Sequence, residues 1–245
     1  MNELAALPTH RDEDFRYADL DALAGVWPVA REDLRVAAGE SGALSIMLDG
    51  AESVARHLVI DIADGASFDL RVLNTGSSFA RIAVDVRLGA KAQFTLGAAQ
   101  LGGGTANLEL VTEVAHLAPD AVSSQTVRSV LGGEAVGTYL GKVAVARGAD
   151  GTDASQSVRA MLLDRTATAN ARPELEIYAD DVKCAHGCAV GELDGQALFY
   201  MAQRGLPPET AKRLMLQAFI AEAFVGAADE DALGEAAQAA LEALL

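Results

Sequence analysis

Hydrophobic and polar residues alternate in short runs through the middle of the chain. In one run, Ile82, Val84, Val86 and Leu88 share one face, and the residues between them form the other. The same alternation recurs at residues 92–96, 107–110, 143–145 and 174–178. An apolar residue at every second position is typical of a half-buried β-strand. The pattern therefore predicts a series of short strands between about residues 39 and 192.

The predicted strands are separated by turn residues and not by helices. Asp64-Gly65, Gly102-Gly103-Gly104 and Asp150-Gly151 lie between the runs, and such residues favour turns. Two architectures fit this pattern: a sandwich or barrel built from hairpins, and a solenoid whose coils stack on one another. The lack of Asn-Gly hairpin turns favours the solenoid slightly, but periodicity alone leaves both open.

The chain divides into three expected regions: an N-terminal segment at 1–38, a β core at 39–192 and a helical domain at 193–245. In the last region, Asp194 is a suitable N-cap for a helix over 195–203, and Gly205 is suited to the position after its end. A second helix of about 17 residues is expected from Pro207-Pro208-Glu209, and a third over 229–245.

Composition narrows the classes of function. The net charge of −16 disfavours binding to nucleic acid or to an anionic membrane. No apolar run is long enough for a transmembrane helix, and no secretory signal is visible at the N-terminus. The two cysteines are four positions apart and do not form a disulfide framework. We therefore expect a cytoplasmic protein with free thiols.

The most distinctive chemistry is the segment Cys184-Ala185-His186-Gly187-Cys188. Thiolate and imidazole bind soft and borderline metals. On a straight strand the three side chains project from one face, with neighbours about 6.6 Å apart and the two cysteines about 13 Å apart. His186 can thus chelate with one cysteine, whereas all three need a turn, which Gly187 would permit. The alternative is that the cysteines are small buried residues and His186 is a hydrogen-bonded core imidazole.

The sequence around this segment resembles a family signature. Residues 172–205 read RPELEIYADDVKCAHGCAVGELDGQALFYMAQRG, and residues 152–156 read TDASQ. Both are similar to motifs of the SufB/SufD family of iron–sulfur cluster assembly proteins, and most of all to SufD. The resemblance implies a right-handed parallel β-helix with a small C-terminal helical domain. By the same resemblance, we expect this chain to lack most of the helical N-terminal portion of SufD proteins.

The resemblance also implies a function and a set of site residues. SufD is a non-catalytic scaffold subunit that pairs with SufB and carries the ABC ATPase SufC on its C-terminal helices. By that likeness His186 is a candidate ligand for a transient iron–sulfur cluster shared with the partner, and Cys184 is a weaker candidate. Cys188 lies where the family has no fixed cysteine, so no role is carried over to it. Thr152–Gln156 is expected to form a turn with side-chain caps and is assigned no chemical role. Met215, Phe219 and Phe224 are candidate contacts for the ATPase, because their helix is apolar on most sides.

The resemblance implies that the isolated chain binds no cofactor tightly. It also allows the isolated chain to form a homodimer. Two competing hypotheses are a β-helix polysaccharide lyase or hydrolase and a structural zinc-binding solenoid. The first is disfavoured by the acidic charge and the 5% aromatic content. It would require a carboxylate pair, and Asp180-Asp181 fits a turn better, because adjacent strand residues face opposite ways. The second predicts one zinc ion in the isolated chain.

Overall fold

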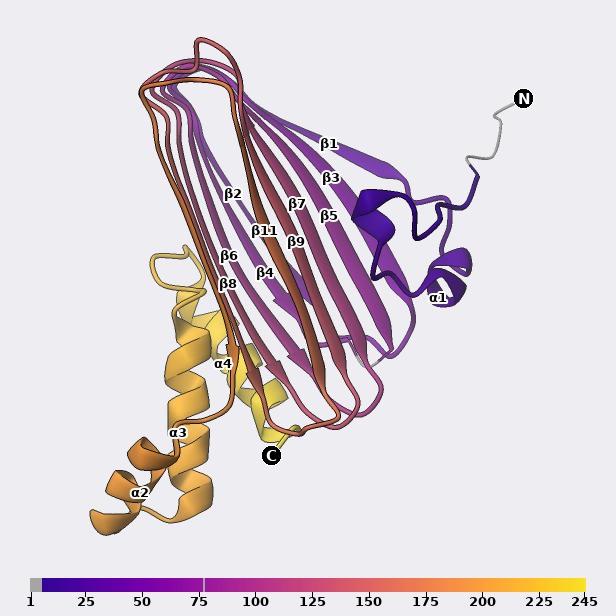
Figure 1. Cartoon of the computed structure of the whole chain (residues 1–245), viewed down its shortest axis with the longest axis vertical. Helices are drawn as coiled ribbons and strands as arrows, with labels where there is room; N and C mark the ends of the chain where they lie inside the picture. Colours follow the sequence, from indigo (N-terminus) through magenta and orange to yellow (C-terminus); the bar gives the residue numbers. More distant parts are fainter. Residues whose placement is uncertain (1–5, 77) are drawn as a thin grey trace.

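The computed structural model describes residues 6–76 and 78–245, and its main body is a stack of β-strands (Figure 1). The strands are β1 (Arg31–Val36), β2 (Ser41–Leu48), β3 (Val54–Ile62), β4 (Ser67–Asn74), β5 (Phe79–Leu88), β6 (Gln93–Gly102), β7 (Asn107–His116), β8 (Val122–Leu131), β9 (Val136–Val145), β10 (Asp153–Leu162), β11 (Thr168–Ile177) and β12 (Lys183–Gly191). The helices are the short 3-10 turn η1 (Glu13–Phe15), α1 (Leu20–Ala24), α2 (Gly195–Gln203), α3 (Pro208–Ala221) and α4 (Glu230–Glu242).

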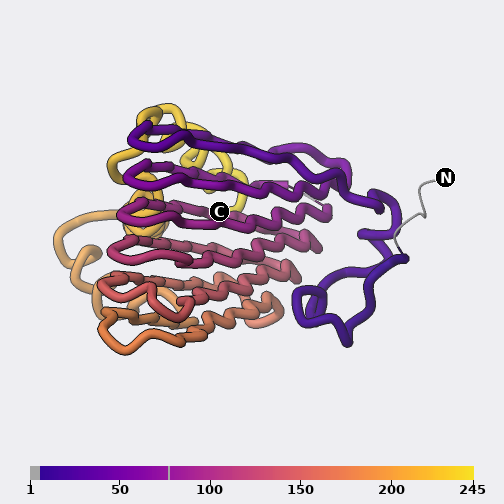
Figure 2. The backbone as a smooth tube through the Cα atoms, turned by 90° about the horizontal axis from the view of Figure 1, so that it is seen from above, coloured from indigo at the N-terminus to yellow at the C-terminus, as the bar shows by residue number. Residues whose placement is uncertain are grey.

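Successive strands belong alternately to two parallel sheets. Sheet A has the order β1-β3-β5-β7-β9-β11, and sheet B has the order β12-β10-β8-β6-β4-β2. Each coil therefore contributes one strand to each sheet, and every strand pairs with the strand two places along the chain (Figure 2). This is a parallel β-solenoid, as the family resemblance implied, and the alternative of a hairpin-built sandwich is excluded.

The core fills the space between the two sheets. Ile82, Val84, Val86 and Leu88 of β5 are all at most 1% exposed and pack with inward residues of the other strands, which confirms the alternation seen in the sequence. At the corners, Gly65, Gly104 and Gly133 have positive φ angles, a conformation that glycine adopts at little cost. Small turn residues thus let the chain pass from one sheet to the other.

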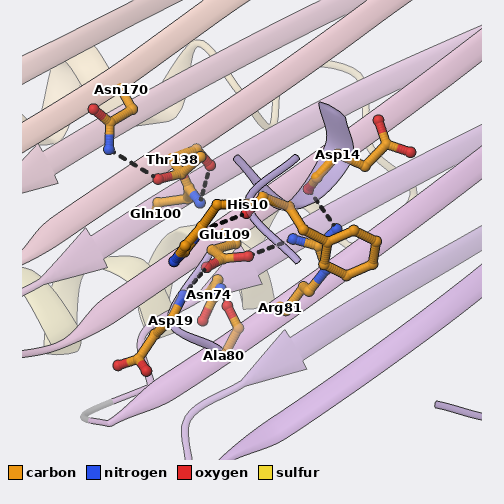
Figure 3. Close-up of polar contacts among 11 residues, drawn as sticks. His10, Asp14, Asp19, Asn74, Ala80, Arg81, Gln100, Glu109, Thr138 and Asn170 are labelled. Atoms are coloured by element: carbon orange, nitrogen blue, oxygen red, sulfur yellow. Dashed lines mark hydrogen bonds and ion pairs between the residues drawn. The ribbon is translucent and has the colours of Figure 1, made fainter. Parts of the chain in front are cut away.

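The N-terminal segment lies on the outer face of sheet A (Figure 3). Arg81 of β5 forms an ion pair with Glu109 of β7 and donates to the Asp14 carbonyl at 2.9 Å. Glu109 Oε1 in turn accepts from the Asp19 amide at 3.2 Å, and the Phe15 ring lies 4.2 Å from the Arg81 guanidinium. A buried ion pair therefore fastens residues 14–19 to the solenoid.

The solenoid begins earlier than the sequence predicted. β1 starts at Arg31 and pairs with β3, whereas the expected boundary was at residue 38. The reason is that four of the six residues of β1 are charged, and only Leu34 and Val36 face the core. A strand at the end of the stack needs few apolar residues, so its alternation is weak.

The C-terminal helices α3 and α4 cover the outer face of sheet B (Figure 1). They form a second core of buried residues from strand and helix: Leu73, Ala99, Leu101, Val130, Leu216, Phe219, Ile220, Ala223, Phe224, Leu233, Ala237 and Leu241. The predicted ends of α2 are confirmed, because Asp194 caps its first turn and Gly205 follows it with a φ of +88°. None of the helices in the described ranges is long and apolar enough to cross a membrane.

Polar contacts fix the C-terminal end of α3 on sheet B. Arg71 Nη1 donates to the Ala223 carbonyl at 2.8 Å, and Arg128 Nη2 donates to Glu222 Oε2 at 2.6 Å. Arg128 Nη1 also donates to the Ser157 carbonyl of β10 at 2.8 Å. A Cβ at Gly97 would lie 1.8 Å from the Ala223 carbonyl oxygen, so only glycine allows this close approach.

Candidate functional site

The last coil leaves one end of the solenoid uncovered. β11 and β12 are the terminal strands of sheets A and B, so their outer backbone groups have no neighbouring strand in the described part of the chain. Their inward side chains also lack a following coil, and Ile177 and Val190 are 39% and 47% exposed. We call these two strands and their inward side chains the open end. Such an edge is a template for pairing with another strand.

The cysteine and histidine residues lie in one row at the open end. In the ladder between β10 and β12, Cys184 pairs with Ala154, His186 with Gln156 and Cys188 with Val158. All three β10 residues are at most 3% exposed, so the row faces the inside of the solenoid. His186 and Cys188 are nevertheless exposed and Cys184 is half-buried, because no coil covers them. The prediction that the three share one face is confirmed.

The strand is straight through Gly187. This glycine has no positive φ, and a Cβ there would meet nothing within 4 Å. The turn that would bring the three side chains together is therefore not made, and the two cysteines remain about 13 Å apart along the strand. No group of three or more His, Cys, Asp or Glu residues suited to a metal ion occurs among the described residues. The described residues of this chain therefore do not supply a complete ligand set at this row.

The pKa of both thiols lies above its ordinary value. Burial raises the pKa of Cys184, and the nearby Asp153 carboxylate adds a smaller increase that an Ala154 backbone hydrogen bond opposes. Burial also raises the pKa of Cys188. Since the thiolate is the metal ligand and the nucleophile, metal binding at either cysteine must displace a proton.

The neighbouring motifs are structural in part. Asp180 and Asp181 lie in the turn between β11 and β12, where the Asp181 carbonyl accepts from the Gly151 amide at 2.7 Å. Thr152 Oγ1 donates to the Ala149 carbonyl at 2.8 Å, so Thr152 caps a turn as predicted. The prediction was wrong for the rest of the motif, because Asp153–Gln156 belong to strand β10 and pair with its neighbours on both sides. Gln156, at the end of the same motif, was not predicted to have a role. The structure places it in β10 directly beside His186.

The candidate partner residues of the helical domain are distributed differently from the prediction. Phe219 and Phe224 are 7% and 1% exposed in the second core, so they are absent from the surface open to a partner, and Met215 is half-buried. The apolar run of α3 is covered by sheet B and α4 of the same chain. The exposed apolar residues near α3 instead include Phe199, Leu214 and Val225, at 65%, 42% and 66%.

Comparison with known proteins agrees with this geometry. A family model described as SUF system FeS cluster assembly, SufBD core domain, matches residues 48–219. Protein ABCI7, chloroplastic, of Arabidopsis thaliana is 34% identical over 161 residues, which are 64% of this chain and 34% of that protein. Iron-sulfur cluster assembly protein SufD of Escherichia coli is 34% identical over 108 residues, covering 44% of this chain and 26% of the relative.

SufD of Bacillus subtilis is 30% identical over 121 residues, covering 49% of this chain and 28% of the relative. The matched segments thus span about a quarter to a third of these relatives. The matched core, however, includes most of the solenoid and extends into α3. With more than half of its length matching the family core domain, the chain belongs to the SufBD family and is a SufD-like protein of the SUF system of iron–sulfur cluster assembly.

Proposed function

We propose that the chain is a non-catalytic scaffold subunit that pairs with a SufB-like homologue through the open end. The observation that carries this proposal is the exposed row containing His186 at the end of the solenoid that β11 and β12 form. A second solenoid placed there would extend both sheets and pair the free backbone groups of β11 and β12. It would also cover Ile177 and Val190, whose apolar side chains are half-exposed.

The same joint would hold the cluster. His186 and Cys184 supply one imidazole and one thiolate, which suit iron and iron–sulfur clusters. Because this chain offers at most two neighbouring ligands, the partner completes the coordination, and the nascent cluster is a cargo shared by the two chains. The isolated chain then holds no cluster tightly.

The helical domain is the proposed docking surface for a SufC-like ABC ATPase. Its exposed apolar and aromatic residues include Phe199, Tyr200 and Leu214, and Met215 is partly accessible. We propose these residues as the ATPase contacts instead of Phe219 and Phe224, which are buried in the second core of this chain. Closure of two ATPase subunits would strain the joint between the solenoids and expose the ligands to iron and sulfide.

The test of the ligand role is co-expression with SufB-like and SufC-like proteins, followed by measurement of bound iron and sulfide. His186→Ala is expected to lower cluster content while the complex still assembles, and Cys184→Ala is expected to have a smaller effect. His10→Ala is the control, since His10 is an exposed residue of the N-terminal segment. Unchanged cluster content in His186→Ala would refute the ligand role. One tightly bound zinc ion in the isolated chain would favour the structural zinc alternative.

The docking surfaces are tested with charged substitutions. Val190→Asp at the open end is expected to prevent pairing with the SufB-like protein, whereas Met47→Asp is not, because Met47 is 53% exposed on β2 at the opposite end of sheet B. Phe199→Asp is expected to weaken ATPase recruitment, and Leu117→Asp, 54% exposed after β7, is its control. Equal binding by variant and control would reject the corresponding surface.

A further inference from the structure

A buried glutamine lies beside the proposed ligand. Gln156 of β10 is the direct ladder partner of His186 of β12, and adjacent strands are about 4.8 Å apart. Paired residues in a parallel ladder project from the same face, so both side chains are directed to the inside of the solenoid. Gln156 is 3% exposed, whereas His186 above it is open to solvent.

One end of the Gln156 amide is already in use. Its Nε2 donates to the Tyr139 hydroxyl at 3.2 Å, and that hydroxyl donates to Gln125 Oε1 at 3.2 Å. Thr112 Oγ1 donates to the same Gln125 oxygen at 3.0 Å. Burial raises the pKa of Tyr139 to about 12, so the hydroxyl keeps its proton for Gln125 and receives the amide hydrogen of Gln156. The hydrogen bonds of the Tyr139 hydroxyl therefore fix the Gln156 amide with its nitrogen toward Tyr139.

The other end of the amide is free. Gln156 Oε1 is buried and has no hydrogen-bond partner among the described residues, a state that costs about 1–3 kcal/mol. Two neighbours in the column could donate to it: Gln125 on the inner side, whose Nε2 is also without a partner in the described chain, and His186 on the outer side. A carbonyl oxygen has two lone pairs, so a contact with Gln125 leaves room for the imidazole.

We infer that Gln156 is the positioning residue of His186, with its Oε1 accepting the N–H of one ring nitrogen. The other ring nitrogen is then unprotonated and directed toward the open end, ready to bind iron. Metal-binding histidines commonly donate their second nitrogen to such an acceptor, which fixes the tautomer and the ring orientation, and loss of the acceptor lowers metal affinity about 10–100-fold. This inference rests on the proposed function, because it assigns His186 as the ligand.

The tautomer of His186 can be measured without any cluster. The isolated chain, labelled with ¹⁵N-histidine, is examined by long-range ¹H–¹⁵N spectroscopy at about pH 8, with His186→Ala used to assign the signals. We expect one tautomer in the wild type and a mixture in Gln156→Met, which preserves volume but removes the acceptor. Gln156→Glu, which restores an acceptor oxygen, is expected to return a single tautomer.

Gln100→Met is the matched control. Gln100 is also an inward amide at 1% exposure, but its partners are the Thr138 carbonyl and Ser129. It lies on β6 and does not neighbour β12. Its substitution is expected to leave the His186 tautomer unchanged. A tautomer mixture in the wild type, or the same tautomer in wild type and Gln156→Met, would overturn the inference, and the wild-type measurement applies even if a variant fails to fold.

The same variants in the co-expressed complex separate this inference from the proposed function. We expect bound iron to fall in both His186→Ala and Gln156→Met while Gln100→Met matches the wild type. If His186→Ala leaves iron unchanged but Gln156→Met still alters the tautomer, the ligand role is wrong and the positioning contact is correct. If His186→Ala lowers iron but Gln156→Met alters neither tautomer nor iron, the positioning contact is wrong.

Discussion

The buried ion pair between Arg81 and Glu109 gives a quantitative test of how the N-terminal segment is attached. The side chains are 5% and 0% exposed, and each also bonds to the backbone of the N-terminal segment, at Asp14 and Asp19. Glu109→Ala would leave the Arg81 guanidinium buried without its counter-charge. Removal of one partner of a buried pair costs about 3–5 kcal/mol.

The assay is urea unfolding followed by circular dichroism. With a dependence of about 2–3 kcal/mol per molar urea, the midpoint for Glu109→Ala should fall by about 1–2 M. Asp33→Ala breaks the exposed Arg31–Asp33 pair, whose side chains are 49% and 56% exposed, and should cost no more than about 1 kcal/mol.

A double variant, Arg81→Met with Glu109→Leu, separates the lost charge from the lost packing. Apolar residues of similar volume often replace a buried pair at little cost, so the double variant should be more stable than Glu109→Ala alone. A cost for Glu109→Ala as small as that for Asp33→Ala would refute the assignment of this pair as the anchor of the segment.

Three further predictions concern the core and the open end. Burial lowers the pKa of His116 to about 4, from about 6.5 in the unfolded chain. The stability that this residue contributes is therefore present above about pH 6.5 and is lost as the pH falls toward 4. Urea unfolding of His116→Gln across this range should show up to about 3 kcal/mol less acid destabilisation than the wild type, and an unchanged profile would contradict the assignment. Phe224→Ala should lower the free energy of unfolding by about 3–5 kcal/mol, whereas Phe199→Ala at the exposed surface should change it by no more than about 0.5 kcal/mol; similar losses in thermal or chemical unfolding would reject the second core. Because burial raises the pKa of Cys184 and Cys188, iodoacetamide should modify both more slowly at about pH 7.5 than it modifies a free thiol. Pairing at the open end should slow the reaction further. Equal modification rates with and without the SufB-like protein would exclude the open end as the pairing surface.

The strands inside the stack could be predicted because their core-facing residues are apolar at every second position. In β5 the alternation from Ile82 to Leu88 matches the observed burial at each of the four apolar positions. The choice between sandwich and solenoid could not be made from this pattern, because a period of two residues specifies a face and not a pairing partner. The family motif supplied that information. Charged β1 was missed because an end strand buries little.

The sequence predicted only the part of the candidate site that lies within a single strand. Period-two geometry places Cys184, His186 and Cys188 on one face, but their exposure depends on β12 being the last strand of sheet B. Gln156 gave no signal, since a polar residue in a strand normally indicates the solvent face, whereas here the Tyr139 hydroxyl bonds it inside. For Phe219, an apolar helix face has the same sequence pattern whether the same chain or a partner covers it.

The guanidinium of Arg128 joins the helical domain to β10, the strand that pairs with the row of Cys184, His186 and Cys188. Glu222 at the end of α3 holds one side of the guanidinium, and the Ser157 carbonyl of β10 holds the other. Ser157 follows Gln156 directly in the chain. Any displacement of the C-terminal end of α3 would therefore reach β10, next to Gln156, through the hydrogen bonds of a single guanidinium.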